Sequence, residues 1–252
     1  ARLQALYDEA GKPGARAFRT YARRKGEELT SAESQSFVAQ QASGQVFAGR
    51  LPSDGKVTAS REDMRAQADL LDFSKRASSQ RDGAAKYALV VVDVFTKEAW
   101  VEVMQDKSDA ETKDAMRQVL SSNGANFKAL SVDLGREFGP GVEELTKDGG
   151  IVVRRKDPHQ INAIAGVERA KQSIKSILKN IQGDGGWAKS IKRAVTLYND
   201  REHSALYGAS PDDVSELPVL QYQLEKEAGE KVAHNNKMWR RKAGRLRDKG
   251  AF

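Results

Sequence analysis

Apolar residues in the middle of the chain form short runs that predict the strands of a sheet. The strongest run is YALVVVDVF at 87–95, which is rich in valine and nearly uninterrupted, so it predicts a central strand covered on both faces. WVEVM at 100–104 alternates apolar and polar residues after a tight turn, and it should pair with that strand as a hairpin. The other predicted strands are 66–73, 127–132 and 151–154.

Apolar residues repeat every three or four positions in the segments between and after the later strands, which predicts helices. The predicted helices are 110–121, 141–147, 162–181 and 187–198. Three strands in a meander, followed by alternating helices and strands, predict an α/β fold with a ribonuclease H-like mixed five-stranded sheet flanked by helices.

The ends of the chain differ from this core. A GKPG break separates two short helical patterns near the N-terminus, and Arg16, Arg19 and Arg23 share one helical face. Two short helices around a turn are compatible with a helix-turn-helix-like DNA-binding segment, but the pattern alone favours a helical pair that packs on the core. The predicted divisions are a helical segment at 1–45, a linker at 46–63, the core at 64–214 and a basic helical tail at 215–252.

Positive charge is concentrated at the two ends. The 252 residues carry 42 Lys and Arg against 35 Asp and Glu, a net charge of +7. Residues 226–250 hold nine basic and three acidic side chains, residues 1–60 hold nine and six, and the middle is slightly acidic. This distribution favours a polyanionic partner such as nucleic acid, although a solvated helix and tail would have the same composition.

The composition excludes several kinds of site. The chain has no cysteine, which rules out disulfides, cysteine nucleophiles and cysteine-ligated zinc, and its three histidines are too scattered for a histidine-built zinc site. Any metal would need oxygen ligands, as magnesium and manganese do. No apolar run approaches the ~18 residues that a membrane-spanning helix requires.

Three carboxylates have positions typical of a functional site. Asp69 interrupts an apolar strand pattern, Asp133 ends another, and Glu168 lies in the long helix that follows the last predicted strand. Phosphoryl transfer uses two hard cations roughly 3.5–4 Å apart, and carboxylates from separate elements can hold them. Each acid also has a simpler interpretation, since Asp69 could lie at a strand edge and Asp93 could be a hydrogen-bonded structural carboxylate. Asp72 should point to the opposite face from Asp69.

An ordered set of motifs resembles the catalytic core of retroviral-type integrases, in the DDE transposase/integrase superfamily. The motifs are AQADLLDF, YALVVVDVFTKEAW, the D-x-G-x-E-F of LSVDLGREF, the V-E-R of NAIAGVERAKQSIKSILK, and the Y-N-x-x-x-H-x-A-L-x-G-x-x-P of YNDREHSALYGASP. The match covers roughly 64–214. The N-terminal flank is similar to the segment that precedes the core in integrases of Maverick/Polinton-type transposons.

The resemblance implies that Asp69, Asp133 and Glu168 are the catalytic residues and the ligands of two Mg²⁺ or Mn²⁺ ions. Asp133 and Glu168 are separated by 34 residues, one fewer than in the retroviral pattern, which a shorter loop accommodates. Asn199 and His203 should be structural, joining the last core helix to its loop. The retroviral zinc module is absent, and no small β-barrel is evident in the basic tail.

Basic and polar residues near these acids are candidates for DNA contact. Lys171, Gln172 and Lys175 follow Glu168 by three, four and seven residues and share its helical face. They should contact DNA phosphates rather than bases. A basic loop, RRKDPHQI, precedes the same helix, and the tail carries a further basic run. The predicted DNA-binding residues are Lys171, Gln172, Lys175, Arg154, Arg155, Lys156, His159, Arg240, Arg241 and Lys242.

The expected function is that of a DNA integrase or transposase. It would hydrolyse element DNA near its 3′ end and then use the freed 3′-hydroxyl to attack target DNA, both by in-line displacement at phosphorus. We expect a homo-oligomer, because integration joins two ends, and neither zinc nor a membrane as partner. A eukaryotic source would place the protein in the nucleus, or in association with a virion or the element. The alternatives are a ribonuclease H-like nuclease that only cuts, and a domesticated DNA-binding protein without catalysis.

Overall fold

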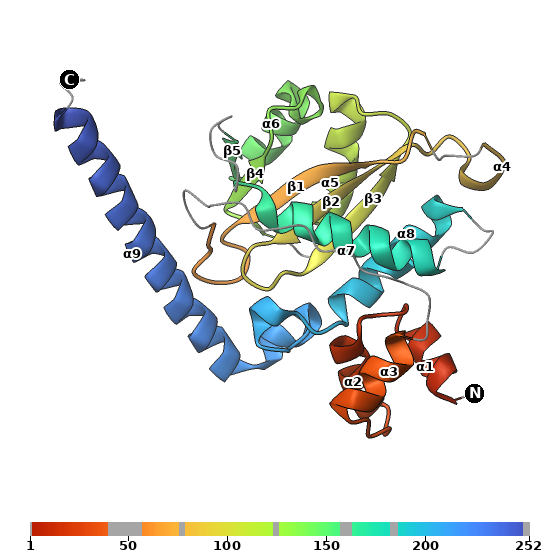
Figure 1. Cartoon of the computed structure of the whole chain (residues 1–252). Coiled ribbons are helices and arrows are strands. Elements are labelled where there is room, and N and C mark those ends of the chain that lie inside the picture. Colours follow the sequence, from red (N-terminus) through yellow and green to blue (C-terminus); the bar gives the residue numbers. More distant parts are fainter. Residues whose placement is uncertain are drawn as a thin grey trace.

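A five-stranded mixed sheet forms the centre of the molecule (Figure 1). The computed structural model describes residues 2–39, 57–75, 79–122, 126–156, 163–181 and 186–248, and the side chains of 39, 79, 122 and 241–248 lie outside this description. The sheet order is β3-β2-β1-β4-β5, antiparallel across β1, β2 and β3 and parallel across β1, β4 and β5. The strands are β1 (Ala66–Asp72), β2 (Tyr87–Asp93), β3 (Ala99–Met104), β4 (Ala129–Val132) and β5 (Val152–Arg155). This confirms the predicted α/β fold.

The strand predicted to be central lies inside the sheet and is covered on both faces, one place from the middle of the sheet. β2 is the most apolar strand and is almost fully buried, but β1 occupies the middle of the sheet. An apolar run indicates burial on both faces, which every internal strand has. The central position is decided by the parallel pairing of β1 with β4, a segment far along the chain.

Helices cover both faces of the sheet (Figure 1). Successive side chains of β1 alternate between these two layers. Ala68 and Leu70 belong to the apolar cluster under α5 and α6, whereas Leu71 belongs to the cluster under α7 and α8. The helices are α5 (Asp109–Ser122), α6 (Pro140–Asp148), α7 (Ala165–Ile181) and α8 (Trp187–Asn199). α7 begins three residues later than predicted.

Three N-terminal helices pack around an aromatic cluster. Tyr7, Phe18 and Phe37 have ring centroids 5.0–5.4 Å apart. The turn after the first helix rests on the core, because the Arg201 guanidinium donates to the carbonyl oxygens of Ala10 and Gly11. The helices are α1 (Arg2–Glu9), α2 (Ala15–Arg24) and α3 (Ser31–Ala39). This segment therefore packs as a helical unit against the core, and whether it also binds DNA stays a prediction. The linker predicted at 46–63 lies outside the described residues up to residue 56.

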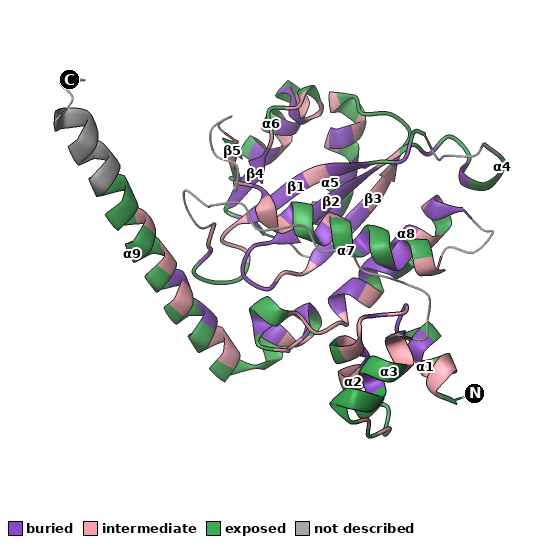
Figure 2. Cartoon of the chain, viewed as in Figure 1, coloured by how far each residue is buried: buried purple, intermediate pink, exposed green. Residues whose placement is uncertain are grey.

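The C-terminal helix α9 (Pro218–Asp248) extends away from the core (Figure 1). Its first turns pack through Leu224 and Ala228, and Leu224 joins the apolar cluster that contains Phe95 and Val214. Between residues 229 and 240 the helix is mostly exposed (Figure 2). Trp239 is among these exposed side chains. None of the helices in the described ranges has the length and apolar character needed to cross a membrane.

Four short elements were not predicted from the sequence. They are α4 (Ser79–Asp82), η1 (Arg136–Phe138), η2 (Ser204–Leu206) and η3 (Pro211–Glu216). Each is a single turn or two, too short for a periodic apolar pattern to show.

Candidate active site

Two of the predicted acids lie at the same level of adjacent strands. In the parallel pair β1 and β4, Gln67 lies beside Ser131. Asp69 follows Gln67 by two residues and Asp133 follows Ser131 by two, just past the end of β4. Neighbouring strands lie about 4.8 Å apart, and residues at equal levels point to the same face. The sheet therefore directs Asp69 and Asp133 toward the α7 face together.

Asp69 already holds a cation. The Lys171 ammonium, on the third residue after Glu168 in α7, forms an ion pair with Asp69 Oδ2. The two side chains are only 18% and 14% exposed, so the pair is largely shielded from water. The other carboxylate oxygen of Asp69 accepts the Leu70 N–H at 2.7 Å. In this structure Lys171 neutralises Asp69, and its contact with DNA stays a prediction.

Gln67 fixes the position of α7 over the sheet. Its Nε2 donates to the Ala163 carbonyl oxygen at 2.8 Å, and its Oε1 accepts the Val167 N–H at 2.9 Å. Gln67 is 1% exposed. A Cβ on Gly166 would lie 2.5 Å from Gln67 Oε1, so only glycine allows this close approach. The exposed Glu168 is thereby held one residue beyond an anchored turn.

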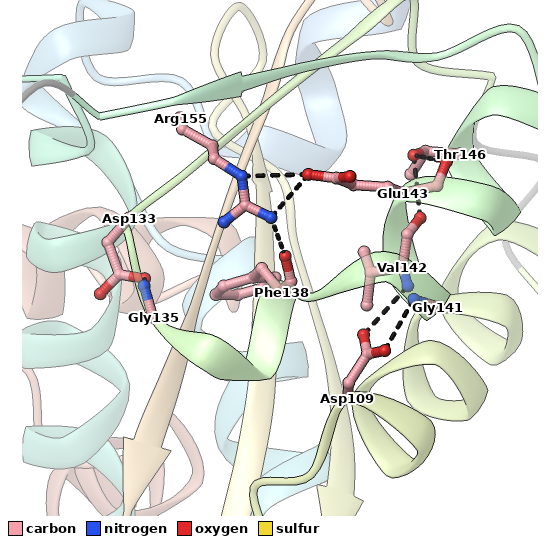
Figure 3. Close-up of polar contacts among 9 residues, drawn as sticks. All are labelled: Asp109, Asp133, Gly135, Phe138, Gly141, Val142, Glu143, Thr146 and Arg155. Carbon is pink, nitrogen blue, oxygen red and sulfur yellow. Dashed lines mark hydrogen bonds and ion pairs between the residues drawn. The ribbon is translucent and has the colours of Figure 1, made fainter.

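Asp133 is oriented by the turn that follows β4. The Gly135 N–H donates to Asp133 Oδ1 at 2.9 Å (Figure 3). A Cβ on Gly135 would lie 2.4 Å from the Glu137 carboxylate carbon, so a larger residue would displace Glu137. The glycine of the D-x-G sequence therefore serves both the hydrogen bond and the packing of the turn.

Arg155, another predicted DNA contact, is paired within the protein. Its guanidinium bonds Glu143 Oε1 at 2.7 and 3.1 Å and also donates to the Phe138 carbonyl oxygen (Figure 3). Asp109 accepts the N–H groups of Gly141 and Val142 at 2.6 and 3.1 Å, which caps the start of α6. These contacts hold the segment after Asp133 against α5 and β5.

The remaining candidate DNA contacts fall into two groups. The first group has exposed or half-exposed side chains that form no ion pair among the described residues. It comprises Arg154, Lys156, Gln172, Lys175 and Arg240. His159 lies outside the described residues, as do the side chains of Arg241 and Lys242.

Asp93, Asn199 and His203 have structural roles. Asp93 is buried and accepts backbone N–H groups at 2.7–3.1 Å, and burial raises the pKa of its carboxyl. Asn199 bonds both backbone groups of Ala99 at 2.9 and 3.0 Å, which joins α8 to β3 rather than to the loop expected from the sequence. His203 Nε2 lies 3.3 Å from the Tyr198 carbonyl oxygen, and burial lowers the pKa of its imidazole to about 4.

The described residues contain no group of three or more acids or histidines arranged to hold a metal ion. The donor chemistry nevertheless fits a hard cation, because Asp69 and Asp133 are carboxylates at one level of the sheet and Asp69 already takes the Lys171 ammonium. The joint binding of ions by Asp69, Asp133 and Glu168 stays a prediction.

Comparisons with known proteins agree with this arrangement at the level of the fold. Neither a protein-family model nor a curated protein matches the chain. The catalytic core domain of BIV integrase superposes with a TM-score of 0.50 and 19% identity, over 60% of this chain and 93% of that chain. A chain of the simian T-cell lymphotropic virus intasome, in complex with PP2A regulatory subunit B56 gamma, gives a TM-score of 0.57 and 13% identity, over 86% and 75%. The fold is that of retroviral integrase catalytic cores, and the closeness to Maverick/Polinton-type elements stays a prediction.

Proposed function

We propose that this chain is a DNA integrase or transposase that processes the 3′ ends of element DNA and transfers them into target DNA. The observation that carries the proposal is the pairing of β1 with β4, whose register leads to Asp69 and Asp133 at one level beneath α7. The integrase-core fold supports it. Its partners would be element and target DNA and further copies of the chain, in the nucleus for a eukaryotic source.

Asp69, Asp133 and Glu168 would hold divalent cations, which activate the attacking oxygen and stabilise the leaving oxygen in phosphoryl transfer. The chain itself supplies the positioning. Gln67 holds the first turn of α7 and therefore Glu168, and the Gly135 N–H orients Asp133. The exposed side chains of Gln172 and Lys175 would contact DNA phosphates.

Strand-transfer assays with labelled donor DNA and Mg²⁺ or Mn²⁺ test this proposal. Asp133→Asn should lower both cutting and joining by at least about a hundredfold, because a catalytic metal ion contributes several kcal/mol. Asp148→Asn, an exposed carboxylate at the end of α6, is the matched control and should retain both activities.

Three outcomes would contradict the proposal or a part of it. Cut products without joined products from the wild-type chain would indicate a nuclease. DNA binding with neither product would indicate a non-catalytic protein of the same fold. Joining retained by Asp133→Asn would remove Asp133 from the site.

A further inference from the structure

A second feature of the α7 face lies away from the predicted acids. A cavity of about 480 Å³ opens between the end of β1, α4, the second half of α7 and the start of α8. Phe73, Leu178 and Trp187 form its apolar part, with Phe73 and Trp187 stacked at a centroid distance of 4.2 Å. The buried indole N–H of Trp187 has no acceptor among the described residues. A volume of this size is typical of binding sites.

The polar lining of this cavity is mainly cationic. It is formed by Lys75, Arg81, Lys175 and Lys179, all of them exposed. None of the four makes an ion pair within the part of the chain that the structure describes, although other lysines and arginines of the core do. Unpaired cations converging on a concave surface attract anions, because the surrounding protein focuses their field.

The two acids that line the cavity are engaged in local hydrogen bonds. Asp72 Oδ1 accepts both the N–H and the hydroxyl of Ser74, and these bonds lower the pKa of Asp72. Asp82 is buried, and its Oδ1 accepts the Ala188 N–H at 3.1 Å in the first turn of α8. Both acids therefore stabilise neighbouring backbone, and the cavity keeps an excess of positive charge.

A row of lysines on α7 leads from the candidate active site to the cavity. Lys171, Lys175 and Lys179 are spaced by four residues, so they form one row on the helix. At 1.5 Å per residue, Lys179 lies about 12 Å along the axis from Lys171, the partner of Asp69. One DNA strand carries a phosphate every 3.4 Å of axis, so this distance spans roughly three to four nucleotides.

We propose that this cavity binds backbone phosphates of the same DNA strand that enters the active site, several nucleotides from the reacting bond. This rests on the proposed function, and it adds Lys75, Arg81 and Lys179 to the DNA-binding surface. The contacts are to phosphates, so they strengthen binding without reading sequence. A second anchor of this kind would fix the direction of the strand across Asp69 and Asp133.

Salt-dependent DNA binding tests the proposal, measured by fluorescence anisotropy with the full chain and a duplex of at least two helical turns. The double variant Arg81→Gln/Lys179→Gln should reduce the slope of log affinity against log salt by about 1.8, at ~0.9 per lost phosphate contact. Between 50 and 200 mM salt, the wild type should then lose roughly twelvefold more affinity than the variant. Lys147→Gln, an exposed lysine of α6 on the other face, is the matched control.

Each outcome decides between the two proposals. A double variant with the same slope as Lys147→Gln overturns the cavity proposal, even if the wild-type chain joins DNA. If the double variant shows the reduced slope but the wild-type chain joins no DNA, phosphate binding in the cavity is supported and the integrase function is contradicted. Binding of inorganic tripolyphosphate that is lost in the double variant, with an unchanged DNA slope, would show a small-anion site and also overturn the proposal.

Discussion

The ion pair between Lys171 and Asp69 makes a prediction about how the site accepts metal ions. A divalent cation that binds Asp69 must displace the Lys171 ammonium, so the pair and the metal compete for one carboxylate. Lys171→Gln removes the competitor and leaves Asp69 without a counter-ion. The variant should therefore be less stable than the wild type without metal and should bind divalent cations more tightly.

The magnitude follows from the geometry of the pair. Two unit charges about 4 Å apart attract by about 4 kcal/mol at an effective dielectric constant near 20. The side chains keep 18% and 14% of their exposure, so water screens part of this attraction. We expect a loss of about 1–3 kcal/mol in the free energy of unfolding, less than for a fully buried pair. The same free energy corresponds to divalent binding that is roughly 5- to 150-fold tighter.

Urea denaturation without metal and Mn²⁺ titration by calorimetry measure the two effects. Lys175→Gln, one turn further along α7 with an exposed and unpaired side chain, should change neither quantity appreciably. The reasoning is refuted if Lys171→Gln is as stable as the wild type and binds Mn²⁺ with the same affinity. Lower stability with unchanged Mn²⁺ affinity would place the metal away from Asp69.

Two further predictions concern stability. Gln67→Ala removes both side-chain hydrogen bonds to α7 and its preceding turn and leaves the Val167 N–H buried without a partner, so the free energy of unfolding should fall by about 2–4 kcal/mol. Urea denaturation measures this fall. A fall no larger than that of an exposed control such as Gln118→Ala would contradict the anchoring role. Burial, and then the nearby charges of Asp212 and Glu62, raise the pKa of Glu98 to about 7. Since this folded-state pKa lies above the ordinary glutamate pKa of 4.5, the folded protein binds the proton more tightly, and stability should fall as pH rises from about 4.5 to about 7. Glu98→Gln should remove that part of the fall, and parallel stability curves for variant and wild type across this range would count against it.

Local patterns were sufficient to predict most of the elements. The valine-rich run, the alternating strand after it and the three-to-four-residue repeats correctly indicated the hairpin and the flanking helices. These features depend on contacts within a few residues or on simple burial, which the sequence records directly. The D-x-G turn after β4 was likewise visible, because glycine shortly after an aspartate favours a tight turn.

Pairings between distant segments were decided only by the tertiary structure. The central place of β1 depends on β4, the anchoring of α7 depends on Gln67, and the partner of Lys171 is a residue 102 positions earlier in the chain. The same is true of the cationic cavity, which four separate elements build. A sequence specifies which side chains carry charge and which faces are apolar, but the partner of a given charge is set by chain packing over long separations. For this protein the sequence determined the sheet-and-helix layout and the candidate acids, and the packed structure determined which cation each acid meets.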